Sequence, residues 1–202
     1  MKIMNYFLCL ALLAGICFAE ETVKVGKDKT LLTDGVSIAV VDLKTNKKNI
    51  VFKGERDDLI KSLSADDALT KIGFLKAGKV YLLDLSTLKA NKLELGTQDV
   101  GYYKNVAVSP DGTKIAGVGV NIAGGAPDEL WVGKIANFKS GEEVEDDVYN
   151  GKRLITNESL VEAKWSTYSK TLTATTTDTE LYVDSELVRV IKNPNAATKG
   201  AK

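Results

Sequence analysis

Histidine is absent from the sequence, and cysteine, proline and tryptophan are scarce, with two, three and two residues among 202. Without histidine the chain can form neither a Ser-His-Asp triad nor a histidine-ligated metal site. Positive and negative side chains balance at 27 each. There is therefore no basic surplus of the kind that nucleic-acid binding requires, and we expect no nucleic-acid partner. The apolar share of 44%, by contrast, is enough for a folded domain.

The first nineteen residues have the pattern of a secretory signal peptide. Lys2 is followed by a nearly continuous apolar run from Tyr6 to Phe18, which is shorter than the roughly 20 residues that span a bilayer. Ala19 precedes an acidic pair, which fits cleavage after Ala19. We therefore expect residues 1–19 to be removed, no stable membrane span, and a periplasmic or secreted protein.

Both cysteines, Cys9 and Cys17, lie within this predicted signal peptide. The segment ending at Cys17 resembles a bacterial lipoprotein box, but Ile16 stands where that pattern has a small residue. We therefore favour ordinary cleavage over lipid anchoring through Cys17. The exported chain would then have no cysteine, which excludes disulfides and thiolate chemistry.

A strand pattern rich in β-branched and apolar residues recurs four times in the remaining chain. Its copies are residues 37–43, 80–85, 130–135 and 181–184, at spacings of 42, 50 and 51 residues. Such a period indicates a repeat architecture. We expect the aromatic residues of the last three copies to pack between neighbouring repeats, at equivalent positions. They are Tyr81, Trp131 and Tyr182.

A second recurring element is a tight hairpin, which is clearest in Ser109–Ala116. Pro110 fixes φ at the second position of a turn, and Gly112 accepts a positive φ. Leu63–Gly73 is a looser copy that carries two extra residues, and Trp165–Leu172 is a degenerate one. Together the two elements predict units of four antiparallel strands.

These hairpins resemble those of the TolB-like β-propeller family. The resemblance rests on Ser109-Pro110-Asp111-Gly112, followed by the strand Leu130-Trp131-Val132, and it covers roughly residues 30 to 193. It implies an all-β fold, a β-propeller of about four four-stranded antiparallel blades. It also implies a periplasmic setting and protein partners.

The turns divide residues 20–193 into four units. We predict blades at Lys24–Lys53, Asp58–Leu95, Lys104–Val148 and Leu160–Lys192. The first unit lacks an evident innermost strand; Glu21–Val25 could supply it, or could pair with the last blade. The blades then form either a closed ring, which predicts a monomer, or an open arc, which predicts a dimer. Residues 194–202 are predicted to be a disordered tail.

Carboxylates gather at Asp57-Asp58, at Asp66-Asp67 and in the run 142–147. Neighbours along a strand point to opposite faces, so these pairs do not by themselves build the facing carboxylates of a glycosidase. Asp66-Asp67 and Asp111-Gly112 also lack the ligand spacing of a calcium loop. We interpret the carboxylates as solvated edges and turns, and predict no catalytic residue, no metal site and no cofactor.

Two features favour binding. Asn121–Asp128 is a glycine-containing loop without the ending of a phosphate loop, and Tyr102-Tyr103 is an aromatic pair in the connection between the second and third units. Loops at a propeller rim commonly carry binding residues. The candidate binding residues are Tyr102, Tyr103, Asn121, Gly124, Gly125 and Asp128.

The sequence thus predicts an exported, non-enzymatic propeller scaffold that binds another protein or a component of the cell envelope. The alternative is a carbohydrate-active propeller enzyme, in which carboxylates converge from several blades.

Overall fold

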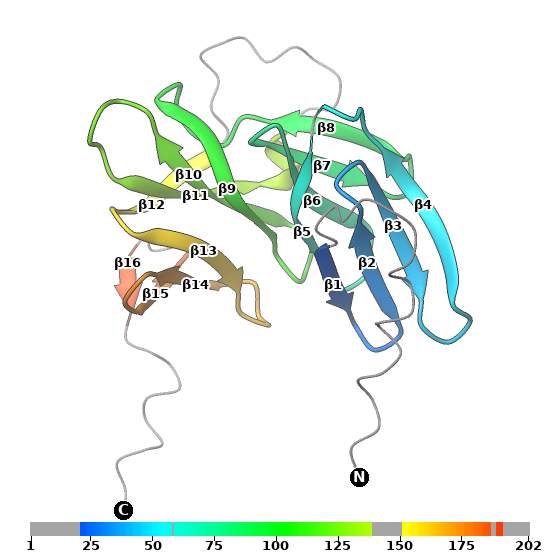
Figure 1. Ribbon diagram of the computed structural model, residues 1–202. Coiled ribbons are helices and arrows are strands. Elements are labelled where there is room, and N and C mark those ends of the chain that lie inside the picture. The colour runs from blue at the N-terminus through cyan, green and yellow to red at the C-terminus, as the bar shows by residue number, and fades with distance from the viewer. Residues whose placement is uncertain (1–20, 58, 139–150, 187–188, 192–202) are drawn as a thin grey trace, which may run out of the picture.

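The computed structural model describes residues 21–57, 59–138, 151–186 and 189–191, which form four sheets of four strands (Figure 1). Every sheet is a meander in which strands that are consecutive in sequence pair antiparallel. The predicted signal peptide, the acidic run 142–147 and the predicted tail lie outside the described residues. The only helical turn in the described part is η1 (Ile135–Asn137), and no helix there could cross a bilayer.

Each sheet is one blade, numbered in chain order. Blade 1 contains β1 (Glu21–Val25), β2 (Lys29–Thr33), β3 (Ser37–Asp42) and β4 (Lys47–Lys53). Blade 2 contains β5 (Ile60–Ala65), β6 (Lys71–Lys76), β7 (Lys79–Asp84) and β8 (Lys89–Leu93). Blade 3 contains β9 (Val100–Val108), β10 (Lys114–Asn121), β11 (Asp128–Lys134) and β12 (Gly151–Asn157). Blade 4 contains β13 (Leu160–Trp165), β14 (Thr171–Thr176), β15 (Glu180–Asp184) and β16 (Arg189–Ile191).

The first strand of blade 1 answers a question that the sequence left open. Residues Glu21–Val25 pair with β2, from Glu21 opposite Thr33 to Val25 opposite Lys29. They supply the missing innermost strand, and pairing with the last blade is wrong. The predicted bounds of blade 3, 104–148, are also wrong, because its first strand begins at Val100 and its last strand is Gly151–Asn157.

The tight hairpin occurs in blades 2, 3 and 4 with one geometry. In each, the fourth residue of the turn donates its N–H to the carbonyl of the first: Leu69 to Asp66, Gly112 to Ser109, and Ser169 to Ser166. The fourth residue has a positive φ in all three, between 53° and 69°. The blade 2 hairpin thus has no extra residues, so that prediction is wrong, and Asp66 takes the place of Ser109.

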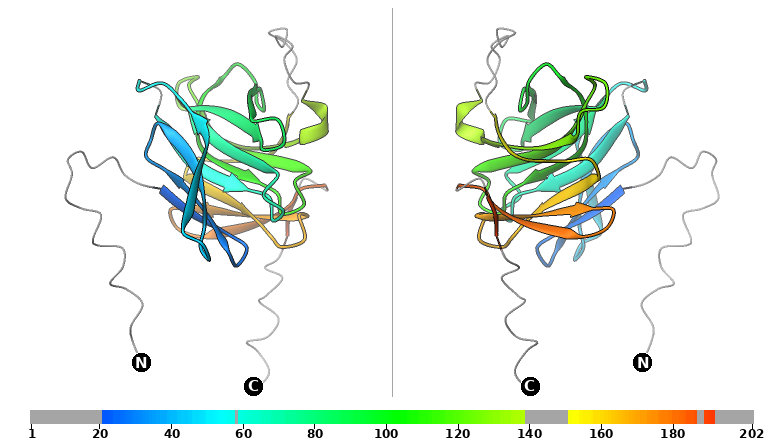
Figure 2. Two further views of the ribbon diagram at one scale, coloured as in Figure 1. Left: turned by 90° about the vertical axis from the view of Figure 1, so that its right-hand side faces the viewer. Right: turned by 90° about the vertical axis from the view of Figure 1, so that its left-hand side faces the viewer.

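Three buried hydrophobic clusters join the four blades. The first lies between blades 1 and 2 and contains Leu31 and Phe74. The second joins blades 2 and 3 through Leu82 and Trp131, and the third joins blades 3 and 4. Among the described strands, extensive contacts between sheets connect successive blades, and none of similar extent connects blade 4 to blade 1. The described sheets thus form an arc (Figure 1), and Figure 2 gives two side views of the same sheets.

The third-strand aromatics divide between packed and outward positions. Tyr81 stacks on Phe74, with ring centroids 5.0 to 5.5 Å apart in the Phe52–Phe74–Tyr81 group, and Trp131 is buried. Tyr182 does not occupy the position equivalent to that of Tyr81. It pairs with Thr173, the third residue of β14, whereas Tyr81 pairs with Phe74, the fourth residue of β6. The residue one earlier, Leu181, packs against the third cluster instead.

Candidate functional site

The predicted binding residues meet where β9 begins and β10 ends. Antiparallel pairing sets Tyr102 of β9 opposite Val120 of β10, and Asn121 opposite Val100. The Ile122 N–H donates to the Asp99 carbonyl at 2.9 Å, which closes this end of the pair. Because β10 leads into the 122–127 loop and then into β11, Tyr102, Asn121 and Asp128 lie at the same end of blade 3. We call this end the blade 3 rim.

The two tyrosines of this rim have different surroundings. Tyr102 is 48% exposed, whereas Tyr103 is buried and belongs to the cluster between blades 2 and 3. Burial raises the pKa of the Tyr103 hydroxyl well above its usual value. Tyr103 is therefore a core residue, and only Tyr102 of the pair presents its side chain to solvent. Both belong to β9, so their predicted location in a connection between units is wrong.

The loop of the blade 3 rim is open but ordered by its own hydrogen bonds. The Asn121 side-chain oxygen accepts from the Ala123 N–H at 2.9 Å, and the Ala126 N–H donates to the Ala123 carbonyl at 3.0 Å. Gly125 has φ of 84°, and a Cβ at Gly124 or Gly125 would meet no atom within 4 Å. The loop tip is thus free to contact a partner.

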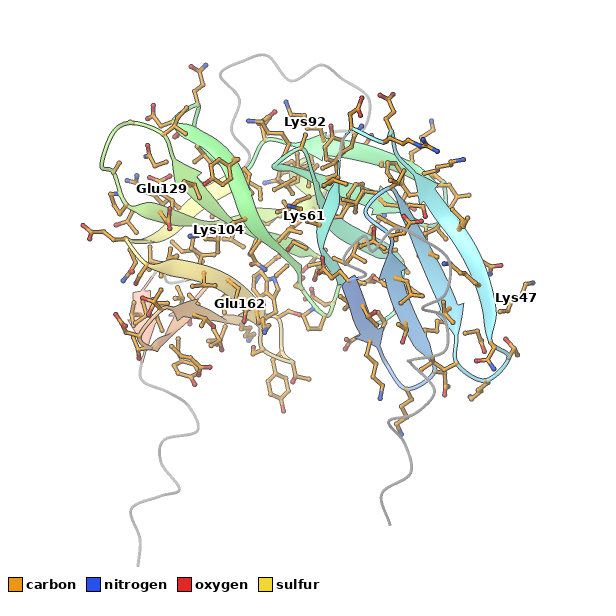
Figure 3. The ribbon with its side chains drawn as sticks, viewed as in Figure 1. Lys47, Lys61, Lys92, Lys104, Glu129 and Glu162 are labelled. Atoms are coloured by element: carbon orange, nitrogen blue, oxygen red, sulfur yellow. The ribbon has the colours of Figure 1, made fainter. Side chains whose placement is uncertain are left out.

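An ion pair forms the base of this loop. Lys104 Nζ of β9 lies 2.6 Å from Asp128 Oδ2 at the start of β11. Both side chains are mostly buried, so water screens this ion pair less than it would screen a fully exposed one. Lys79 Nζ, from the neighbouring blade, donates to the Gly101 carbonyl at 3.0 Å. Figure 3 labels Lys104 on its strand.

Sequence reasoning missed two exposed apolar side chains. Ile122 is 65% exposed and lies against Gly101, where any side chain would collide with it. Its place in a glycine-containing loop was the available indication. Tyr168 is 84% exposed at the tip of the β13–β14 hairpin. This hairpin joins the end of a first strand to the start of a second strand, whereas the blade 3 rim lies where β9 begins and β10 ends.

Several of the described carboxylates accept hydrogen bonds from residues of their own turn or hairpin. Hydrogen bonds from Lys71 and then from the Ser86 hydroxyl hold the pKa of Asp84 far below its usual range. Burial raises the pKa of Asp111, but hydrogen bonds from Ser109 and Thr113 outweigh it and lower that pKa to about 2. Asp66 accepts from the N–H groups of Thr70 and Lys71 at 2.8 and 2.7 Å. Within the described residues no group of three or more acidic or cysteine side chains could hold a metal ion.

One carboxylate is buried within blade 3. Glu129 accepts from Trp131 Nε1 and from Arg153 Nη1, both at 2.8 Å. Both carboxylate oxygens have a donor, and Glu129 is 3% exposed. The carboxylate therefore satisfies the indole N–H of Trp131 inside the protein and does not face solvent.

No protein-family model matches the chain, and no curated protein matches its sequence. Solved structures do match. TolB from Acinetobacter baumannii superposes with a TM-score of 0.56 at 17% identity, over 85% of this chain and 43% of TolB. A nidogen/laminin complex gives a TM-score of 0.57 at 11% identity, over 81% and 58% of the two chains. Hydrazine synthase from Kuenenia stuttgartiensis gives 0.53 at 14% identity, over 82% and 45%.

The chain spans about half the length of these structures. At such identities the likeness concerns the fold, and propellers serve both as binding proteins and as enzymes. Four sequential antiparallel blades, joined by buried clusters and superposable on TolB and nidogen, give this chain the β-propeller fold.

Proposed function

We propose that the protein is an exported, non-enzymatic propeller that binds another protein or a cell-envelope component through the blade 3 rim. The carrying observation is that Tyr102, 48% exposed, and Ile122, 65% exposed, lie beside and within an open loop at the paired ends of β9 and β10. Exposed tyrosine offers a large contact area with little loss of side-chain entropy, and such residues dominate many interfaces.

The surroundings of these side chains support binding over catalysis. Lys104 and Asp128 pair with each other, so neither is poised as an isolated acid or base. The turn carboxylates Asp84 and Asp111 accept hydrogen bonds that favour their ionised forms, whereas a glycosidase needs one carboxyl group with a raised pKa. Asp84 and Asp111 are therefore poor candidates for the carboxyl pair that the enzymatic alternative requires.

The test is affinity capture from envelope extracts of the native organism, with the purified protein as bait. Tyr102→Ala and Ile122→Ser should each weaken capture of the specific partner by about tenfold or more, as residues at the centre of an interface do. Tyr168→Ala is the matched control, because it removes an even more exposed tyrosine from the opposite end of the strands. A partner that is lost with Tyr168→Ala and retained with the other two variants would refute the assignment to the blade 3 rim.

Export is a separate part of the proposal and rests on the N-terminal pattern. Amino-terminal sequencing of the protein from its host should begin at Glu20, and recovery with residues 1–19 intact would contradict it.

A further inference from the structure

The arc leaves one sheet face uncovered at each end. In blades 2 and 3 both faces are buried, one against the preceding blade and one against the following blade. Among the described residues, the hydrophobic cluster of blade 1 lies toward blade 2 and that of blade 4 toward blade 3; on the other face of blade 1 the small Ala39 is also buried. We call the uncovered face of blade 1 the leading face and that of blade 4 the trailing face.

The leading face is apolar with a basic border. Side chains alternate along strands, so the neighbours of Leu31 and Ile38, which are buried toward blade 2, point the other way. Ladder pairing aligns Thr22, Leu32, Ala39 and Ile50 in one row, and Lys24, Thr30, Val41 and Lys48 in the next. Ile50 is 62% exposed. In blade 2 the face that corresponds to this one is buried.

The trailing face is polar where the other blades are apolar. Ladder registers equate Thr175 with the buried Leu75 and Val118, and Glu180 with the buried Val80 and Leu130. Tyr182 likewise stands where Leu82 and Val132 are buried, and its hydroxyl donates to Glu180 at 2.9 Å. By the same registers, and among the side chains that the structure describes, the face carries Glu162, Glu180 and Asp184 against Lys164. It thus has an excess of carboxylates, whereas the strand charges of the leading face are lysines.

A ladder of polar contacts runs between the innermost strands. The Glu21 carboxylate accepts from the N–H groups of Ser62 and Leu63, at 2.6 and 2.8 Å. The Ser62 hydroxyl accepts from the Val106 N–H at 2.9 Å, and the Asn105 side chain accepts from the Ala163 N–H at 2.8 Å. Each innermost strand thus offers a side-chain acceptor to the backbone of the next one.

Glu162 is the corresponding residue of the last blade. It pairs with Thr175 just as Glu21 pairs with Thr33 and Asn105 with Val118, at equivalent ladder positions. In blade 1, the N–H group equivalent to those of Val106 and Ala163 is that of Thr22, which pairs with Leu32. Figure 3 shows Glu162 on its strand, where it meets Lys164 at 2.7 Å.

We propose that the trailing face of one copy docks on the leading face of a second copy, head to tail. Glu162 then accepts from the Thr22 N–H of that copy and continues the ladder, while Lys24 and Lys48 face the carboxylates of the trailing face. The threonine methyl groups cover Leu32, Val41 and Ile50. The carboxylate excess of one face and the lysines of the other favour this orientation over two leading faces packed together, which would oppose lysine to lysine.

Light scattering and sedimentation velocity of the purified protein test the proposal. The mean mass should rise with protein concentration, and association should weaken with added salt because the charges are near the surface. A head-to-tail contact gives a mass that stops at two copies if the ring closes, and continued growth if the chain stays open. Two like faces packed together also give a dimer, and the charge-reversal variants below separate the two arrangements. A protein that remains a monomer up to about 100 μM, a weak-affinity range, would overturn the proposal.

Charge reversal identifies the faces involved. Glu162→Lys with Glu180→Lys should weaken association by about tenfold or more, and so should Lys24→Glu with Lys48→Glu. All four changes in one chain should recover part of the association, because each face then meets the opposite sign again, whereas a lysine at position 162 cannot accept from the Thr22 N–H. Tyr168→Ser, which lies on neither face, serves as the control, and circular dichroism checks that each variant is folded. A dimer that is insensitive to the Glu162 and Glu180 changes would also overturn the proposal.

Discussion

At the scale of single residues, the hairpins show what positive φ angles cost. Asn46 and Leu88 occupy the same position in the β3–β4 and β7–β8 hairpins, with φ of 55° and 56°. Asparagine adopts this conformation readily, whereas leucine is strained there. Leu88 is also 58% exposed, so the burial of its side chain offsets little of the free-energy cost of that strain.

Leu88→Asn should therefore stabilise the protein by about 1 kcal/mol, because asparagine relieves part of the roughly 1–2 kcal/mol that the left-handed region costs other residues. Urea unfolding measures the change. Leu43→Asn is the control, because Leu43 is also exposed but is not among the residues with positive φ, and it should give no gain. Equal gains from both variants would indicate a general effect of removing exposed leucine, not relief of backbone strain.

At the scale of elements, one hairpin geometry is built from three different sequences. In blade 3 the Ser109 hydroxyl accepts from the Lys114 N–H. In blade 2 the Asp66 carboxylate has the same role and accepts from the N–H groups of Thr70 and Lys71. Only blade 3 has glycine at the position of positive φ, where blades 2 and 4 have Leu69 and Ser169. The turn thus tolerates side chains that are not branched at Cβ, because the surrounding strands fix its conformation.

Gly112→Val should destabilise the protein by roughly 1–3 kcal/mol, since a β-branched residue is strained at positive φ. A Cβ at Gly112 would also lie 3.1 Å from Asp66 Oδ2 of the neighbouring blade. Gly112→Ser should cost less, because Ser169 already occupies the equivalent position. Thr113→Val is the control outside the strained position and should cost far less than Gly112→Val. Equal thermal unfolding midpoints for the two valine variants would show that the turn is not constrained in this way.

At the scale of the whole molecule, the blades are joined by apolar clusters and by the polar ladder near their innermost strands. Ser62 has φ of 54° within an irregular stretch of β5, which leaves two consecutive N–H groups unpaired in the β5–β6 ladder. Glu21 accepts from both. A carboxylate that bridges adjacent N–H groups is a strong, charge-assisted contact, so Glu21 fixes blade 1 to blade 2.

Glu21→Ala should destabilise the protein by about 1.5–3 kcal/mol, the range for hydrogen bonds to a charged group. Glu21→Gln keeps one acceptor oxygen and should recover part of the loss. Thr22→Ala changes the exposed neighbour and should alter stability by no more than about 0.5 kcal/mol. Chemical unfolding of the three variants provides the comparison, and an unchanged Glu21→Ala midpoint would contradict the bridging role.

The sequence by itself determined the repeat, the strand content and the Ser109–Gly112 turn, because these depend on local patterns: alternation, β-branching, and residues suited to particular φ angles. It predicted that Asn121 and Asp128 border a loop for the same reason. Only the tertiary structure decided that β1 pairs with β2, that Tyr103 is buried while Tyr102 is exposed, and that Tyr182 faces outward. A shift of one residue moves a side chain to the other face of a sheet, and whether that face is covered depends on what packs against it in the folded chain.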